Sequence, residues 1–262
     1  MRTEERRKQI EAYLQKVEFA SLEELAHHVG ASRSTIRRDL ALLEAAGLIR
    51  RTYGGARILN PKSDEFAFVA RDGRQVAEKE AIAKQVIKLL QPGQTIIVDA
   101  GTTTYHVARY LEPLRPQIIT NSLPVATLFA GTPTVEMVVT GGVLYPRLGV
   151  LLGPLTVEAL KHMHADVAVM GAGGITEEGI TNSHSLLIDV QRAMMKAAEK
   201  VIFCLDHTKL GKSSIAYLCD LSEVDLLVTD SKADSHIVER LRKKGLEVLL
   251  APLSEEAPLP SS

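Results

Sequence analysis

Residues 32–40 combine hydroxyl and guanidinium side chains with regularly spaced apolar ones. Ile36, Leu40 and Leu43 follow one another at intervals of four and three, which places them on one face of a helix that Ser32 is positioned to cap. The opposite face then presents hydrogen-bond donors and positive charge, supplied by Ser34, Arg37 and Arg38. Because guanidinium and hydroxyl groups bind base edges or phosphates, this helix is suited to contact duplex DNA.

A second basic segment, residues 48–57, follows this helix and predicts a β-hairpin with its turn at Gly54 and Gly55. Such a hairpin is the wing of a winged helix, and covering the small core is its alternative role. We expect the following residues to contact DNA: Ser32, Arg33, Ser34, Thr35, Arg37, Arg38, Arg50, Arg51, Tyr53 and Arg57. The sequence does not separate base-reading from phosphate-binding contacts, and solvated arginines remain the alternative. Asp39 is expected to pair with a nearby arginine instead.

Positive charge is concentrated in this region, although the 262-residue chain has a net charge of −1. Residues 1–60 contain eleven Lys and Arg against eight Asp and Glu, whereas the remainder contains twenty against twenty-four. A basic patch on an otherwise acidic protein favours one oriented mode of docking on nucleic acid. The distribution therefore indicates double-stranded DNA as a partner of the N-terminal region.

Two further helices are expected to position the candidate DNA contacts. Apolar periodicity predicts them over residues 4–16 and 22–29, and Ser21 with Glu24 forms a capping box at the start of the second. A glycine then provides a tight turn into the helix described above. Helix, turn and helix over about residues 20–39 is the arrangement of a helix-turn-helix motif.

From residue 75 the chain alternates strand-like and helical segments, the pattern of an α/β domain with a largely parallel sheet. Small polar residues follow several of these strands, at positions 99–104, 121–122, 141–142 and 171. Ligands of open α/β sheets bind at the carboxyl ends of the strands. Free backbone N–H groups and hydroxyls before a helix N-terminus suit a phosphate.

We therefore expect a phosphorylated ligand at this edge, bound by Asp99, Gly101, Thr102, Thr103, Thr104, Asn121, Ser122, Gly141, Gly142, Gly171, Asp206 and Lys209. An ordinary strand–helix turn remains the alternative for residues 101–104, and helix caps remain the alternative for Asp99 and Asp206. The P-loop ending Gly-Lys-Ser/Thr is absent, and residues 171–174 lack the spacing of a dinucleotide fingerprint.

Composition excludes several other classes of protein. No apolar run approaches the roughly 20 residues of a membrane span, and no signal-peptide core follows the charged N-terminus. Cys204 and Cys219 are too few for a disulfide framework or a zinc site, and the eight histidines lack metal-binding spacing. We expect a cytoplasmic protein that needs no metal and no cofactor.

Shifts in composition divide the chain into two domains. Residues 1–58 form the expected DNA-binding domain, and residues 59–74 are polar and irregular, as in a linker. Residues 75–250 form the expected effector-binding domain. The proline-rich segment 251–262 is expected to be a disordered tail.

Several motifs are similar to those of one family. The N-terminal motifs are Leu22-x-Glu24-Leu25-Ala26, Ser32-x-Ser34-Thr35-Ile36-Arg37-Arg38-Asp39-Leu40 and Gly54-Gly55-Ala56. The C-terminal motifs include Arg71, Lys79, Asp99-x-Gly101-Thr102-Thr103, Thr120-Asn121-Ser122, Gly141-Gly142, Asp206-x-x-Lys209-x-Gly211 and Thr229-Asp230. Together they resemble the DeoR family of bacterial transcriptional regulators over residues 3–58 and about 75–232. Tyr53 departs from the pattern, since the family often has His there.

The resemblance implies a winged helix-turn-helix domain followed by a larger α/β sensor domain, related to the fold of ribose-5-phosphate isomerases and CoA transferases. It implies a homo-oligomer, dimer or tetramer, that represses a carbohydrate operon and leaves the operator when a phosphorylated sugar binds. A sugar-phosphate isomerase-like enzyme is the alternative. Those isomerases have a loop rich in carboxylates, whereas residues 170–175 have none, and general acid–base catalysis needs a titratable group. We therefore expect a regulator and not an enzyme.

Overall fold

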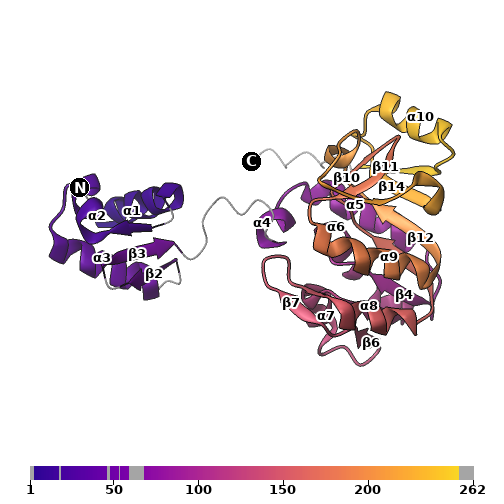
Figure 1. Ribbon diagram of the computed structural model, residues 1–262, viewed down its shortest axis with the longest axis horizontal. Helices are drawn as coiled ribbons and strands as arrows, with labels where there is room; N and C mark the ends of the chain where they lie inside the picture. Colours follow the sequence, from indigo (N-terminus) through magenta and orange to yellow (C-terminus); the bar gives the residue numbers. More distant parts are fainter. Residues whose placement is uncertain (1–2, 18, 46–47, 53, 59–67, 254–262) are drawn as a thin grey trace, which may run out of the picture. The chain divides into compact units, whose positions relative to one another are not determined.

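The computed structural model describes residues 3–17, 19–45, 48–52, 54–58 and 68–253. The chain divides into two compact units, Met1–Phe66 and Ala67–Ser262, and each is described by itself (Figure 1).

The first unit packs helices against a small antiparallel sheet. Its described elements are α1 (Thr3–Val17), β1 (Phe19–Ser21), α2 (Leu22–Val29), α3 (Arg33–Ala45), β2 (Ile49–Thr52) and β3 (Gly55–Ile58). The strand order is β1–β3–β2, so that β3 is central. The predicted capping box of α2 is confirmed, because Ser21 Oγ accepts from Glu24 N at 3.2 Å and Glu24 Oε2 accepts from Ser21 N at 2.7 Å.

The core of the first unit contains the apolar face predicted for α3. Ile36 and Leu40 are at most 1% exposed and Leu43 is 5% exposed, and they pack with Leu14 and Leu25 of α1 and α2. The predicted register of α3 is thereby confirmed, and its hydroxyl and arginine side chains lie on the outside. This is the winged helix-turn-helix arrangement expected from the sequence.

The second unit is built on a seven-stranded parallel sheet with the order β15–β14–β12–β9–β4–β5–β6. Its strands are β4 (Thr95–Val98), β5 (Gln117–Thr120), β6 (Glu136–Val139), β9 (Ala165–Met170), β12 (Ala198–Cys204), β14 (Leu226–Asp230) and β15 (Val248–Ala251). The central strands are buried on both faces, as their continuous apolar runs require.

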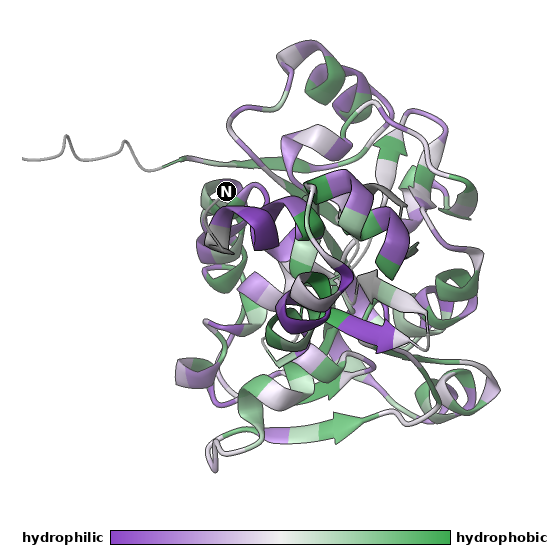
Figure 2. Cartoon of the chain, turned by 90° about the vertical axis from the view of Figure 1, so that its left-hand side faces the viewer, coloured by the Kyte–Doolittle hydropathy of each residue, from purple (hydrophilic) through white to green (hydrophobic). Residues whose placement is uncertain are grey.

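Helices cover both faces of this sheet, and each face has its own hydrophobic core. One core contains residues of α5 (Val76–Ile87), α6 (Thr102–Ala108) and α7 (Leu123–Phe129). The other contains residues of α8 (Pro154–Lys161), α9 (Ile188–Lys196) and α10 (Ser235–Lys243). α10, at the top of Figure 2, has hydrophobic and hydrophilic sides, and its Val238 and Leu241 face the sheet.

Two smaller sheets extend this architecture. β7 (Val143–Tyr145) and β8 (Val150–Leu152) form a hairpin, and β10 (Gly174–Thr176), β11 (Gly179–Asn182) and β13 (Ala216–Cys219) form an antiparallel sheet. Short 3₁₀ turns η1 (Glu112–Leu114), η2 (Ser185–Leu187), η3 (His207–Lys209) and η4 (Leu221–Glu223) connect the larger elements. The turn η3 is part of the candidate site described below.

The expected linker, residues 59–74, needs a correction. Residues 68–72 form the helix α4 (Phe68–Asp72), which belongs to the second unit. Local sequence could not predict α4, because a helix of five residues is held by contacts with other elements and not by its own propensity. Those contacts come from residues later in the chain, described below.

The expected tail also begins too early. Ala251 is fully buried as the last residue of β15, where it pairs with Asp230, so the sheet continues one residue beyond the predicted boundary. Its burial depends on the neighbouring strand and not on local composition. Residues 254–262 lie outside the described part of the chain.

Candidate DNA interface and effector site

Ser32 begins the candidate recognition helix α3, as predicted. Its hydroxyl accepts from Thr35 N at 3.3 Å, and its carbonyl accepts from Ile36 N at 3.0 Å. The Ser32 hydroxyl also lies 2.9 Å from Ser34 Oγ and 2.8 Å from Thr35 Oγ1. The three hydroxyls therefore form one cluster at the start of α3, and contact with DNA would reorganise it.

Arg37 and Arg38 are two candidate DNA contacts whose side chains bond to no other described residue. Both are exposed on α3, and neither has an ion-pair or hydrogen-bond partner among the described residues. Arg33 is also exposed, but its guanidinium pairs with Glu23 of α2. Arg37 and Arg38 can therefore bind DNA without first breaking an interaction within the protein, whereas Arg33 would exchange one partner for another.

Asp39 pairs with arginine, as the sequence predicted. Its carboxylate accepts from Arg6 at 2.6 and 3.3 Å and lies 3.8 Å from Arg7, and the residue is 2% exposed. These contacts join α1 to the inner side of α3. Sequence reasoning missed Arg6 and Arg7, because residues 33 positions apart meet only after folding.

The candidate wing places two of its arginines at the surface. Arg50 and Arg51 of β2 are exposed next to buried Ile49. Arg51 donates to Glu44 through its backbone N at 2.8 Å and its Nε at 2.5 Å, and these bonds lower the pKa of Glu44. The backbone of Arg57 lies opposite Arg50 in β3. Tyr53 lies outside the described residues.

Asp99 occupies the centre of the candidate effector edge, where β4 ends. Its Oδ1 accepts from Ala100 N at 2.7 Å, and its Oδ2 accepts from Gly171 N at 3.0 Å. Asp99 is 4% exposed, and its burial raises its pKa, while these hydrogen bonds oppose that shift. Asp99 therefore holds the turns after β4 and β9 together, and the Gly101 and Gly171 backbones approach closely there.

Gln191 is a buried residue of this site that sequence reasoning missed. Its Nε2 donates to Asp99 Oδ2 at 2.7 Å and to Gly171 O at 2.8 Å, and its Oε1 accepts from Asn182 Nδ2 at 2.8 Å. Gln191 is 2% exposed on α9. The available signal was the spacing of Gln191, three positions after Ile188 and three before Met194, which places its amide on the apolar face of the helix, where a buried amide must find partners.

We expect Gln191→Leu to lower the free energy of unfolding of the second unit by roughly 2–4 kcal/mol, because it leaves Asp99 and Asn182 short of buried partners. Urea unfolding followed by circular dichroism measures this change. Gln85→Leu is the matched control, since Gln85 is half-buried on α5 and its side chain bonds, within the described segments, only to Lys88 at the surface. Equal losses in the two variants would contradict a special role for Gln191.

The three threonines after Gly101 differ in their availability to a ligand. Thr104 is completely buried, and its hydroxyl bonds to Gly101 N at 2.9 Å and to Asp99 O at 2.6 Å. Thr102 and Thr103 are 6% and 9% exposed, and their hydroxyls have no partner within the described part of the chain. Their backbone N–H groups belong to the first turn of α6, where no intrahelical acceptor exists.

Asn121 and Ser122 have buried structural contacts at the end of β5. Asn121 Nδ2 donates to Leu151 O at 3.0 Å, and Ser122 Oγ caps α7 by accepting from Val125 N at 3.4 Å. Both residues are 1% exposed. These bonds fix the turn after β5, and they leave the side chains little freedom to contact a ligand.

Gly141 and Gly142 follow β6 at the edge of the sheet. A Cβ atom on Gly142, whose φ is 126°, would lie 2.1 Å from Thr156 Oγ1 and 2.7 Å from Leu152 O. Thr156 Oγ1 also donates to Gly141 O at 2.7 Å. The glycines therefore permit close packing of the β7–β8 hairpin and α8, a structural requirement that is independent of any ligand.

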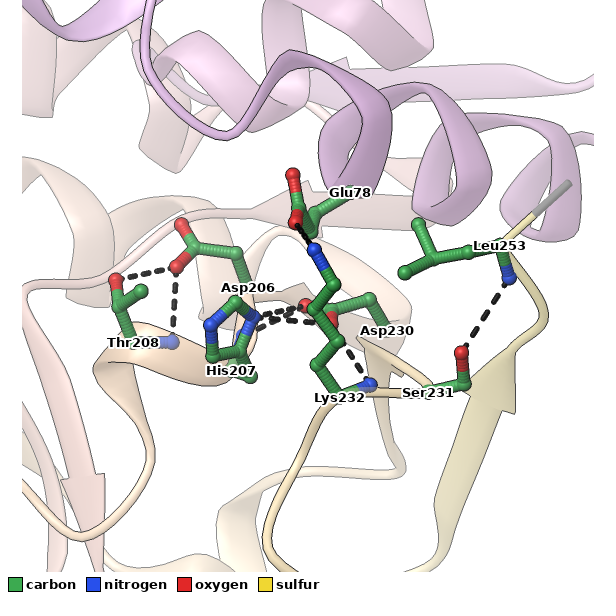
Figure 3. A network of polar contacts seen from close by, with 8 residues as sticks. All are labelled: Glu78, Asp206, His207, Thr208, Asp230, Ser231, Lys232 and Leu253. Carbon is green, nitrogen blue, oxygen red and sulfur yellow. Dashed lines mark hydrogen bonds and ion pairs between the residues drawn. The ribbon is translucent and has the colours of Figure 1, made fainter. Parts of the chain in front are cut away.

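Asp206 follows β12 and belongs to the polar network drawn in Figure 3. It caps η3, accepting from Thr208 N at 3.0 Å and from the Thr208 hydroxyl. Asp230, at the end of β14, accepts from His207 N at 2.7 Å and lies 3.0 Å from His207 Nδ1. The carboxyl ends of β12 and β14 are thereby joined.

A salt bridge connects this network to α5. Lys232 Nζ lies 2.7 Å from Glu78 Oε1, and this bond lowers the pKa of Glu78 (Figure 3). Lys209, the last residue of η3, is half-buried. The ends of β4, β9, β12 and β14 therefore form one polar edge that includes Asp99, Gly171, Asp206 and Asp230.

A second candidate pocket of this unit is less suited to a phosphorylated ligand. An apolar groove of about 850 Å³ lies between β7, α8 and α9, but its lining includes none of the expected effector residues.

Among the described residues, no group of three His, Cys, Asp or Glu side chains could hold a metal ion. No helix in the described segments has the length and apolar character to cross a membrane.

Comparisons with known proteins agree with the two-unit architecture. The DeoR-like helix-turn-helix domain model matches residues 6–62, and the DeoR C-terminal sensor domain model matches residues 74–231. A solved ribose 5-phosphate isomerase A from Methanocaldococcus jannaschii aligns at 17% identity and a TM-score of 0.38, covering 50% of this chain and 52% of its own.

Two relatives match nearly the whole chain. The HTH-type transcriptional regulator GolR of Listeria innocua is 34% identical over 94% of this chain and 98% of its own. The HTH-type transcriptional repressor GlcR of Bacillus subtilis is 32% identical over 97% and 99%. The chain therefore belongs to the DeoR family and is a DNA-binding transcriptional regulator, not an enzyme.

Proposed function

We propose that this regulator represses a carbohydrate operon and that a phosphorylated sugar releases it from operator DNA. Residues 1–58 bind the operator through α3 and the β2–β3 wing, and residues 75–250 bind the effector. The name of the Bacillus subtilis relative, a repressor, supports the sign of the regulation.

One observation supports the effector site above all. The hydroxyls of Thr102 and Thr103 and the N–H groups beside them have no partners in the described chain, at a point where Gly101 and Gly171 let a ligand approach the backbone. Unpaired donors at a helix start favour an anion with several acceptor oxygens. Lys209 adds positive charge, and Asp206 offers an acceptor for sugar hydroxyls.

We also propose that the protein works as a homo-oligomer, a dimer or a tetramer. Helix-turn-helix proteins read operators as pairs of half-sites related by symmetry, so two copies of α3 contact successive major grooves. Once one copy is bound, the second binds its half-site at a high effective concentration, which raises the affinity of the pair above that of either copy alone.

A thermal-shift screen of the full chain tests the effector class. A panel of phosphorylated sugars is compared with the same sugars lacking phosphate and with inorganic phosphate. At a hundredfold excess over its dissociation constant, a specific ligand stabilises the fold by about 2.7 kcal/mol. We expect at least one sugar phosphate to raise Tm while its unphosphorylated form does not. If every phosphorylated sugar leaves Tm unchanged, the proposed effector class is wrong.

Thr102→Ala with Thr103→Ala tests the position of the site. Removing two hydroxyls that bind a phosphate should weaken binding of that sugar phosphate by about ten- to a hundredfold, while operator affinity persists. Isothermal titration calorimetry and fluorescence anisotropy measure the two affinities. An unchanged effector dose response in this variant would exclude the Gly101–Thr104 turn as the binding site.

A further inference from the structure

α4 is the first described element of the second unit, and in the sequence it follows the segment that leads from the DNA-binding unit. It has five residues, none of them buried. Five residues make about one and a half helical turns, too few for a stable helix on its own. Contacts with α5 and α6 must therefore hold α4 in place.

Lys79 of α5 provides the strongest of these contacts. Its Nζ donates to the carbonyls of Arg71 at 2.5 Å and Asp72 at 3.3 Å, the last two residues of α4. These carbonyls lack intrahelical donors, and the negative end of a helix favours a cation. Lys79 is 3% exposed, and its burial lowers its pKa. If α4 moves away, the buried ammonium of Lys79 loses the two carbonyl oxygens that replace its hydrogen bonds with water, and a buried charge without such partners is unfavourable.

The β7–β8 hairpin contacts α4 through one backbone bond, from Phe68 N to Arg147 O at 3.2 Å, and α6 provides side-chain contacts. His106 Nε2 lies 3.2 Å from Asp72 Oδ1, and the ring of Phe68 meets that of Tyr105 edge to face with centroids 5.4 Å apart. His106 is 3% exposed. α6 also begins with Thr102 in the proposed effector site, so the same short helix contacts both α4 and the site.

Charged groups at the end of α4 also interact electrostatically with the expected effector residues. The positive charge of Arg71 acts on the buried carboxylate of Asp99, where it opposes the rise in pKa that burial causes. Lys79 interacts electrostatically with Asp206 and Lys209. An anion at this edge therefore changes the electrostatic environment of both cations that fix the end of α4.

We propose that Lys79 and Phe68 couple the effector site to the DNA-binding unit by docking α4 on α5 and α6. This inference rests on the proposed function and adds the route of regulation. Effector phosphate favours the docked state because Arg71, a residue of α4, lies near the effector edge only when α4 is docked. In the undocked state residues 68–72 no longer pack on α5 and α6, and we propose that the protein binds the operator in this state. Allostery requires two distinct sites, an element with two states and a ligand that contacts those states differently. Here the sites are the effector edge and the DNA-binding unit, and α4 is the element with two states.

Three variants of the full chain test the coupling. Lys79→Met removes the ammonium with little change in shape, Phe68→Ala removes the ring contact away from the effector site, and Val69→Ala changes an 83% exposed residue of the same helix. The operator is first selected from a random duplex library. Its dissociation constant is then measured by anisotropy with and without the sugar phosphate identified by the thermal-shift panel.

Couplings between sites typically change affinity about 5- to 150-fold, and we expect wild type and Val69→Ala to lose operator affinity within this range when the effector binds. Lys79→Met and Phe68→Ala should lose less than about threefold, although calorimetry shows that Phe68→Ala still binds the effector. A wild-type response in Phe68→Ala, or a lost response in Val69→Ala, would overturn the proposal.

A second measurement needs no effector. Because coupling is reciprocal, operator DNA should undock α4 and speed amide hydrogen exchange in the peptide 68–79 of the wild type. In Lys79→Met the exchange should already be fast and insensitive to DNA. Equal exchange in wild type and Lys79→Met would overturn the coupling even if the panel finds an effector. If the panel finds none, the proposed effector class fails and this measurement still decides the role of α4.

Discussion

Replacing Arg37 and Arg38 together by alanine should weaken operator binding by about thirtyfold to ten-thousandfold, since each arginine–base contact contributes about 1–3 kcal/mol. Both side chains are exposed and unpaired among the described residues, so the loss comes from DNA contacts and not from the fold. Alanine is also the best helix former, which preserves α3. Fluorescence anisotropy at several salt concentrations measures the effect.

The salt series separates the two roles of these arginines that the sequence left open. A lost phosphate contact reduces the slope of log affinity against log salt by about 0.9 for each contact, whereas a lost base contact weakens specific binding more than non-specific binding. Lys84→Ala with Lys243→Ala removes the same charge from exposed positions of the second unit. Undiminished affinity in the double arginine variant would exclude α3 as the recognition helix.

Gly55→Ala should unfold the first unit at a much lower temperature than the wild type. A Cβ atom at this position would lie 2.1 Å from Ala20 O and 2.8 Å from Ser21 Cα, both backbone atoms of the neighbouring strand β1. Backbone atoms of paired strands cannot move apart without breaking the sheet. We expect a loss of about 2–4 kcal/mol, or roughly 10–25 °C in Tm for a unit of this size.

The neighbouring glycine provides a matched control. A Cβ on Gly54 would meet no atom within 4 Å, so Gly54→Ala should change stability by less than about 1 kcal/mol. Calorimetry of the full chain measures both variants, and operator affinity should fall only in Gly55→Ala. Similar Tm values for the two variants would mean that β3 does not approach β1 as closely as the structure shows.

Local sequence determined the apolar face of α3 and the capping box of α2. The intervals between Ile36, Leu40 and Leu43 set the buried face of α3, and Ser21 and Glu24 bond to each other across one helical turn. These features depend on residues within a few positions of one another, whose geometry is fixed once the helix forms. Local sequence also determined which polar residues follow the parallel strands. The alternation of strands and helices then brings the carboxyl ends of these strands to one edge of the sheet.

Only the tertiary structure decided which polar side chains meet. Asp39 bonds to Arg6, which lies 33 positions away in the sequence, and Asp99 bonds to Gln191, which lies 92 positions away. The sequence contains many other polar residues that could pair with either aspartate. Which of them come within hydrogen-bond distance depends on how the helices and strands pack. The structure also distinguished Thr102 and Thr103, whose hydroxyls are unpaired among the described residues, from Thr104, which is committed to its own turn.

The two domains, the helix-turn-helix and the polar edge followed from the sequence alone, because hydrophobic periodicity and turn chemistry act over short distances. Helix α4 did not, because a helix of five residues depends on contacts with residues that follow it in the chain, among them Lys79, His106 and Tyr105. Sequence therefore identified the family of this regulator and the residues that we propose for operator and effector binding. The contacts between distant residues, which depend on packing, decided the arrangement through which we propose that one site influences the other.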